Sequence, residues 1–109
     1  MNKLLILLLQ FVAAPDKYFT TNACNGTAAA GTYTSSAKTA GVMCCGIAGG
    51  VCSGSCSVSQ TWSAAVLTCA FKGMRLCSKG EVVGLLCCGQ GDTTCDAKTF
   101  WTLSVEGGK

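Results

Sequence analysis

The stretch that decides the fold is residues 62–81, WSAAVLTCAFKGMRLCSKGE. Within it, four residues recur at the spacing of one helical face: Trp62, Ala65, Val66 and Cys69. This periodicity predicts a helix over 61–72, and Gly73 follows as its stop signal. Because Cys69 shares the apolar face, we expect the helix to carry a cysteine into the core.

The second half of the stretch predicts a second helix. Ser78 and Glu81 have the S-x-x-E form of a capping box, which opens a helix that we expect to run through Leu86. Residues 74–77, between the two helices, are expected to be short and extended. The Gly-rich residues 87–92 that follow predict a turn.

Strand signals lie on both sides of this stretch. Residues 41–46 (GVMCCG) predict a buried strand, residues 100–103 (FWTL) a second one, and residues 32–34 a third, short one. The rest of 15–40 and the Gly/Ser/Cys-rich stretch 47–57 are expected to be loops. The predicted fold class is therefore a small disulfide-rich α+β domain, with two short helices packed on a few short strands.

Ten cysteines in 109 residues are a composition typical of a disulfide scaffold. The even count could close five bridges, each worth roughly 2–4 kcal/mol. Neighbouring cysteines cannot easily bond to each other, so each adjacent pair is expected to tie one segment to two different places. The partners stay open, since ten cysteines allow on the order of a thousand pairings. The candidates are Cys24, Cys44, Cys45, Cys52, Cys56, Cys69, Cys77, Cys87, Cys88 and Cys95.

Zinc binding is the rival interpretation of these cysteines. Cys52 and Cys56 form a C-x-x-x-C pair, and clustered thiolates can hold zinc. The chain has no C-x-x-C motif and no histidine. Its apolar N-terminal leader, residues 1–14, indicates an oxidising compartment. We therefore predict disulfides, no metal site and no cofactor.

Three segments organise the chain. Residues 1–14 are apolar after a weakly positive start and predict a signal peptide, with cleavage before Pro15. A retained hydrophobic leader on a membrane or partner is the alternative. Residues 15–40 form a Thr/Ala/Gly-rich segment, and residues 41–109 form the cysteine-rich module. The sequon at Asn25 fits a glycosylated loop of a secreted protein.

Composition narrows the function classes. Charged residues make up 12% of the chain, the net charge is +3 and histidine is absent. These values argue against a dedicated nucleic-acid binder and exclude histidine-based catalysis. Five acidic residues and oxidised thiols leave little material for an active site, so we predict no enzyme activity and no catalytic residue.

The combined spacing over residues 42–103 resembles a known module. The pattern is A-x-x-x-C, then G-x-R-L-C-S-x-x-E, then CCG, then an aspartate and Trp-Thr. It resembles a small cysteine-rich extracellular module of dinoflagellate and other algal proteins, for which no activity is implied. The order of elements is also distantly similar to the first half of the C-type lectin-like fold, which implies glycan or protein binding. The proline-containing tripeptide of calcium-dependent sugar sites is absent, because the only proline is Pro15.

Three side chains are candidate binding residues. Arg75 could grip a carboxylate or sulfate, although we favour an ion pair with an acid such as Glu81. Asp92 and Asp96 flank Cys95 and could offer oxygen atoms to calcium, although turn chemistry explains them as well. Two further residues could stack on a sugar but fall at core-facing positions: Trp62 and Trp101.

These observations favour a non-catalytic, secreted or extracytoplasmic module that binds a glycan or protein surface. The alternative is a structural accessory subunit of a larger membrane-associated assembly, for example in the thylakoid lumen beside an algal photosystem. A third hypothesis rests on the two CC doublets, which are similar to those of the surface-active hydrophobins. Four single cysteines lie between the doublets here, whereas hydrophobins carry two.

Overall fold

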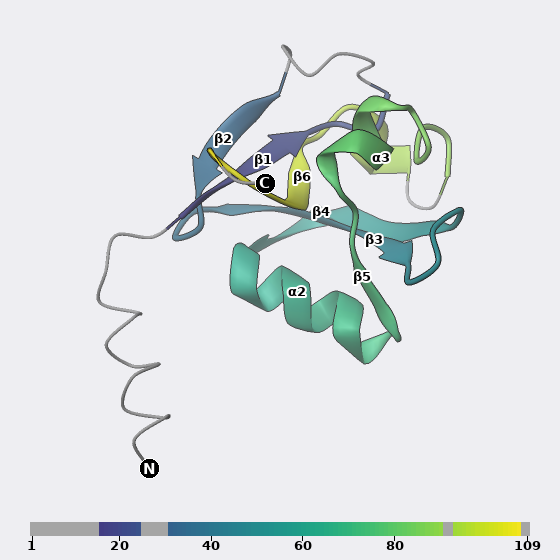
Figure 1. Ribbon diagram of the computed structural model, residues 1–109, viewed down its shortest axis with the longest axis horizontal. Coiled ribbons are helices and arrows are strands. Elements are labelled where there is room, and N and C mark those ends of the chain that lie inside the picture. Colours follow the sequence, from purple (N-terminus) through teal and green to yellow (C-terminus); the bar gives the residue numbers. More distant parts are fainter. Residues whose placement is uncertain (1–15, 25–30, 91–92, 108–109) are drawn as a thin grey trace.

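Six strands and two helices make up the fold of the computed structural model, which describes residues 16–24, 31–90 and 93–107 (Figure 1). The strands are β1 (Lys17–Thr21), β2 (Thr32–Ser35), β3 (Thr39–Gly46), β4 (Cys52–Thr61), β5 (Met74–Leu76) and β6 (Phe100–Val105). The helices are α2 (Trp62–Phe71) and α3 (Lys79–Val83), with a 3-10 turn, η2 (Thr93–Asp96). The expected disulfide-rich small domain is confirmed, but strands dominate it more than predicted.

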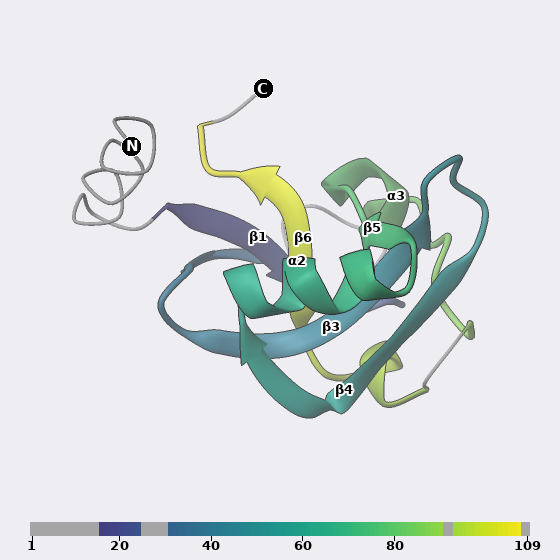
Figure 2. The same ribbon diagram turned by 90° about the horizontal axis from the view of Figure 1, so that it is seen from below.

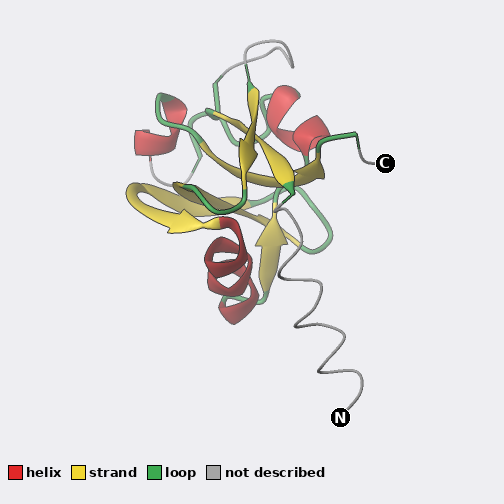
Figure 3. Ribbon diagram, turned by 90° about the vertical axis from the view of Figure 1, so that its left-hand side faces the viewer, coloured by secondary structure: helices red, strands yellow, loops and turns green. Residues whose placement is uncertain are grey.

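The sheet has the strand order β2-β1-β6-β3-β4, and β5 pairs with β3 beside β6. All pairs are antiparallel except β3 and β6, which meet in parallel at Gly41 and Phe100. The two helices lie on opposite sides of the β3–β4 layer (Figures 1 and 3). Strands from the N-terminal and C-terminal parts of the chain are therefore neighbours in one sheet.

Two hydrophobic cores lie on the two sides of β3. One gathers Met43, Cys45 and Phe100 with other buried residues on the α3 side, and the other gathers Cys44, Cys69 and Trp101 under α2. Successive side chains of a strand point to opposite faces, so Cys44 and Cys45 enter different cores. Each doublet residue is consequently available to a different part of the fold.

The predicted first helix is confirmed. Thr61 is its N-cap and accepts a hydrogen bond from the Ala64 amide, while Lys72 is the C-cap. Gly73 follows with φ of +71°, a left-handed conformation that suits glycine. The predicted apolar face is the buried one: Ala65 and Cys69 are fully buried, and Trp62 and Val66 pack against the same core.

The second helix begins as predicted but is shorter. Both hydrogen bonds of the capping box between Ser78 and Glu81 are present. The helix ends at Val83, not at Leu86, with Gly84 as its C-cap. Leu85 has φ of +65°, so the backbone leaves the helical conformation there.

Two strands correct the expectation of loops. β1 lies within the stretch 15–40, and β4 replaces most of the loop expected over 47–57. β4 forms because its small residues pair with β3 along most of its length, and because disulfides fix Cys52 and Cys56. The short 3-10 helix η2, at Thr93–Asp96, was not predicted either.

Candidate interaction surface

Five disulfides join all ten cysteines, so this domain has the cross-links typical of extracytoplasmic proteins. They link Cys24 to Cys88, Cys44 to Cys69, Cys45 to Cys77, Cys52 to Cys87, and Cys56 to Cys95. Each CC doublet ties its segment to two places, as expected from the sequence. The partners themselves depend on how α2, β5 and the segments that follow α3 pack against β3 and β4, which the sequence alone did not supply.

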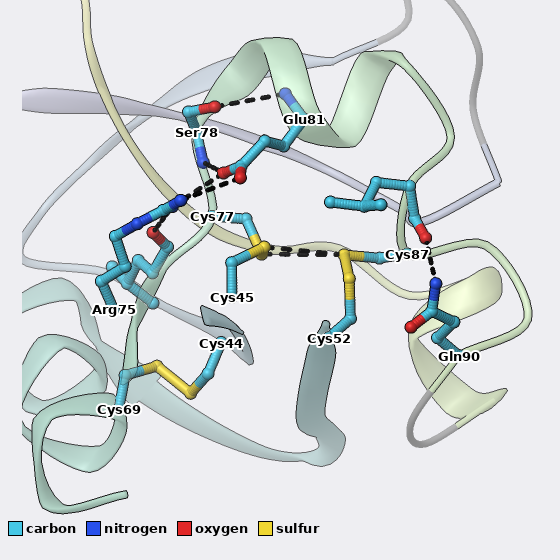
Figure 4. Close-up of a disulfide and its surroundings, with 12 residues drawn as sticks. Cys44, Cys45, Cys52, Cys69, Arg75, Cys77, Ser78, Glu81, Cys87 and Gln90 are labelled. Atoms are coloured by element: carbon cyan, nitrogen blue, oxygen red, sulfur yellow. Dashed lines mark hydrogen bonds and ion pairs between the residues drawn. A yellow bond between two sulfur atoms is a disulfide. The ribbon is translucent and has the colours of Figure 1, made fainter. Parts of the chain in front are cut away.

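Arg75 is engaged within the fold. Its guanidinium donates from Nη1 to Oε1 of Glu81 at 2.7 Å and from Nη2 to Oε2 at 2.9 Å (Figure 4). Nη1 also donates to the backbone oxygen of Leu76 at 3.2 Å. The expected ion pair with Glu81 is therefore present. The guanidinium is engaged in hydrogen bonds within the fold, so it is not free to bind an external anion.

Glu81 joins this ion pair to the start of α3. Its Oε1 accepts a hydrogen bond from the Ser78 amide at 2.8 Å. The hydrogen bonds from Arg75, with those from Ser78, lower the pKa of Glu81 to about 2. The same contact with Glu81 raises the pKa of Arg75. The pair thus locks β5 to α3 with both groups charged.

Of the two acidic candidates, the structure describes Asp96. Asp96 is half-buried, and its Oδ1 accepts a hydrogen bond from the Gly89 amide at 3.2 Å. It lies near the exposed Cys24–Cys88 bridge. Because these two sulfur atoms are bonded to each other, the Asp96 carboxylate is the one group of this cluster that could still ligate a metal ion. Asp92, the Asn25 sequon and the leader 1–14 lie outside the described residues.

The two tryptophans have structural partners. Trp101 is fully buried, and its Nε1 donates to the backbone oxygen of Gln60 at 2.7 Å. Trp62 stacks on Tyr18 with ring centroids 3.9 Å apart, and its Nε1 donates to the oxygen of Thr102 at 3.0 Å. Both side chains therefore pack the α2 core.

A groove of about 210 Å³ opens between α2 and β4. Its lining is mixed, with two valines, three neutral polar residues and one lysine: Val42, Ser55, Val58, Gln60, Thr68 and Lys72. Thr68 donates to the Gln60 side chain at 2.8 Å, which joins the helix to the strand across the groove floor. Lys72 is exposed, and in the part of the chain that the structure describes it makes no ion pair.

Exposed apolar side chains flank this groove. Val58 on β4 and Leu67 on α2 are each 57% exposed, and Phe71 at the end of α2 is 87% exposed. On a helix, residues 68 and 72 lie on the stripe next to 71 and 67, so the apolar residues continue the groove wall outward. We use the name α2–β4 surface for the six groove residues, which include Val58, together with Leu67 and Phe71.

The α2–β4 surface also includes an open strand edge. β4 is last in the sheet order, so no described strand pairs with its outer side. At Cys56 the strand is held by η2, because the Cys56 amide donates to Oγ1 of Thr94 at 3.3 Å and its sulfur is bonded to Cys95, so the available edge lies beyond Cys56. Residues 57–59 of this strand are exposed. Figure 2 shows α2 lying across β3 with β4 along the rim of the sheet. A strand edge, an apolar wall and a cation thus occur together.

The sequence contains two signals for this surface, one for the strand β4 and one for the exposed apolar residues of α2. Serine alternates with small or apolar residues from Cys52 to Ser59, and this period of two is typical of a strand. Phe71 and Leu67 fall off the apolar face of the predicted helix, which indicates exposed apolar side chains. Pairing these two signals required the packing of α2 on the β3–β4 layer.

Within the described ranges, neither helix is long and apolar enough to cross a membrane. Comparison with models of known protein families, with curated proteins and with solved structures finds no match to this chain.

Proposed function

We propose that this chain is a non-catalytic, extracytoplasmic module that binds a protein through the α2–β4 surface. The single observation that carries the proposal is the open edge of β4 beside exposed apolar residues, above all Phe71 at 87% exposure. Exposed apolar groups in a patch are typical of interaction sites. No part of this support comes from the resemblance to algal modules or to lectin-like folds.

The chemistry of the surface favours an extended segment of the partner. An open edge offers backbone N–H and C=O groups to an added strand. Val58 and Phe71 would then contact alternate apolar side chains of that segment, since side chains of a strand alternate between faces. Lys72 at the groove favours a segment that carries an acidic residue.

A protein partner is favoured over a glycan by the state of the two tryptophans. Tryptophan is the aromatic residue that the sequence offered for stacking on a sugar, but Trp62 already stacks on Tyr18 and Trp101 is buried. Arg75 is likewise held by Glu81. Of the exposed apolar residues, Val58 lies on the edge strand β4, where backbone pairing is available, and Leu67 and Phe71 lie on α2 across the groove.

The test is selection of linear peptides from a displayed library on the folded, oxidised chain. We expect enrichment of extended peptides with alternating β-branched or aromatic residues and one acidic residue. Phe71→Ser should weaken their binding about tenfold or more, which corresponds to about 1.4 kcal/mol. Leu103→Ser is the matched control, because Leu103 is exposed on β6, away from the groove.

Two results would overturn the proposal. One is that the selected peptides bind Phe71→Ser and the wild type equally well. The other is that no peptide is enriched while the same protein binds a defined sugar on a glycan array, which would assign the module to glycan recognition.

The second candidate is a structural accessory subunit, in which the same surface is permanently covered. The high exposure of Phe71, Leu67 and Val58 favours it, because a permanent partner would bury this apolar area. Native purification separates the two hypotheses. A stoichiometric membrane-associated complex supports the subunit, including the version in the thylakoid lumen, and a free secreted chain beginning near Pro15 supports the module.

A further inference from the structure

Two disulfides of the α3-side core lie against each other. They are Cys45–Cys77 and Cys52–Cys87, and all four sulfur atoms lie within 4.8 Å of one another. Cys87 Sγ is 3.7 Å from Cys77 Sγ and 3.9 Å from Cys45 Sγ (Figure 4). We call these four residues the four-sulfur cluster. Each sulfur therefore has a second possible partner within 4.8 Å.

We propose that the four-sulfur cluster is a thiol-reactive site, at which a small thiol exchanges the two disulfides for Cys45–Cys52 and Cys77–Cys87. The site takes a monothiol as its co-reactant and returns it unchanged. This inference does not require the proposed protein-binding function.

Exposure selects Cys52 as the point of attack. Cys52 is 6% exposed, whereas Cys45, Cys77 and Cys87 are 0% exposed. The incoming thiolate attacks Sγ of Cys52, the bond to Cys87 breaks, and its electron pair leaves on Cys87 as a thiolate. The external thiol is then held on Cys52 as a mixed disulfide.

Two internal steps complete the exchange. In the closed form Cys87 Sγ lies beside the Cys45–Cys77 bond, nearly equidistant from its two sulfur atoms. Once released from Cys52, the Cys87 thiolate turns into line with this bond and attacks Cys77 Sγ, and the Cys45–Cys77 bond breaks to leave a thiolate on Cys45. Cys45 then attacks Sγ of Cys52 and releases the external thiolate. Three bonds form and three break, so no net oxidation or reduction occurs.

The Cys45–Cys52 bridge of the final pairing is compatible with the backbone. Cys45 and Cys52 are direct partners across β3 and β4. Such cross-strand partners have Cα atoms roughly 4.5–5.5 Å apart, which is inside the range that a disulfide spans.

The exchange changes what the bridges connect. Before the exchange, the bridges Cys45–Cys77 and Cys52–Cys87 both tie the hairpin of β3 and β4 to the segment between residues 77 and 87, which contains α3. After the exchange, one bridge lies within the hairpin and the other within that segment. The α3 segment then loses both covalent links to the hairpin.

Peptide mapping without reduction reads out this change. The oxidised chain is incubated with 2-mercaptoethanol, blocked with N-ethylmaleimide, and cleaved with trypsin and with a protease that cuts before aspartate. From the lysines, arginine and aspartates of the sequence, the cysteine-containing fragments are 18–38, 39–72, 76–79, 80–91 and 92–95.

The original pairing holds all these fragments in one disulfide-linked species. Exchange splits it in two, because the Cys45–Cys52 bridge is internal to 39–72. Fragment 39–72 then keeps only 92–95, and fragment 76–79 moves to 80–91. Fragment 18–38 is joined to 80–91 through Cys24–Cys88 in both arrangements. Because that bridge is exposed, the thiol can also open it, which releases 18–38 without changing the fragment to which 76–79 is bonded.

We expect the split species only when thiol is added. Its rate of formation should rise about tenfold from pH 6 to pH 7, because the attacking species is the thiolate. Retention of 76–79 on 39–72 at every thiol concentration would overturn the proposal. Transfer of 92–95 to another fragment would also overturn it, since that result means shuffling through unfolding.

A variant tests the point of attack. Cys52→Ala with Cys87→Ala removes the bridge that the thiol enters and leaves Cys45–Cys77 closed. In this variant we expect 76–79 to remain on 39–72 after thiol treatment. Release of 76–79 from 39–72 at the rate seen in the wild type, with 2-mercaptoethanol bound to Cys77 or Cys45, would show that the thiol attacks Cys45–Cys77 directly and that the exchange does not begin at Cys52.

Discussion

Consecutive residues of β3 and β6 serve different cores of this molecule. Cys44 packs beneath α2 while Cys45 lies on the α3 side, and Phe100 and Trp101 divide in the same way. This division follows from the alternation of side chains along a strand. The sequence therefore predicts that a CC doublet on a strand has two destinations. It does not predict the destinations, because these depend on which strands lie beside it.

Gly54 is required by close backbone contact. A Cβ at this position would overlap the carbonyl oxygen of Val42 on the paired strand. We expect Gly54→Ala to lower the free energy of unfolding by about 2–4 kcal/mol, because β3 and β4 must move apart. Chemical denaturation of the oxidised protein measures this loss.

Gly80 is the control for this substitution. A Cβ there meets nothing within 4 Å, and the residue lies inside α3. Gly80→Ala should therefore stabilise the protein by roughly 0.5–1 kcal/mol through helix propensity. Equal effects of the two substitutions would contradict the steric argument.

At the scale of elements, one ion pair connects β5 to α3. Arg75 and Glu81 form two hydrogen bonds, with 28% and 21% of their side chains exposed. Partial exposure to water reduces the strength of such a pair. The pair still has consequences for pH, because the pKa of Glu81 falls to about 2 in the folded state.

We expect Glu81→Gln to reduce the free energy of unfolding at pH 7 by about 1–2 kcal/mol after allowance for solvent screening. A depressed carboxyl pKa stabilises the fold above the unfolded value, near 4.5. This contribution is lost as the pH falls towards 2. The difference between variant and wild type should therefore shrink from pH 5 to pH 2 in denaturant titrations. A difference that is constant over this range would contradict the assignment.

Elements with strong local signals were predictable, and those that depend on pairing were not. The helical period from Trp62 to Cys69 and the capping box at Ser78 specify α2 and the start of α3. β4 is rich in serine and contains Gly54, which are weak strand formers. It becomes a strand through pairing with β3 and two buried bridges. The α2–β4 surface was missed for the same reason.

At the scale of the whole molecule, one bridge differs from the other four in exposure. Cys24 and Cys88 are exposed, and the other eight cysteines are buried. We expect a limiting amount of a phosphine reductant to open Cys24–Cys88 first. Alkylation followed by mass spectrometry should find the label on these two residues.

Opening this bridge alone has a defined cost. It closes a loop with a sequence separation of 64, so its loss should reduce stability by about 4 kcal/mol on the loop-entropy model. The four buried bridges should remain closed. Labelling of Cys44 or Cys69 before Cys24 would contradict this order.

The place of β6 in the sheet constrains how the protein is made. β6 lies between β1 and β3, although it comes after all the other described strands in the sequence. Until residues 100–105 leave the ribosome, the earlier strands form two separate halves with an open gap between them. All ten cysteines precede β6 in the sequence, so any bridge that closes before β6 joins the sheet closes without the complete sheet to align its two cysteines.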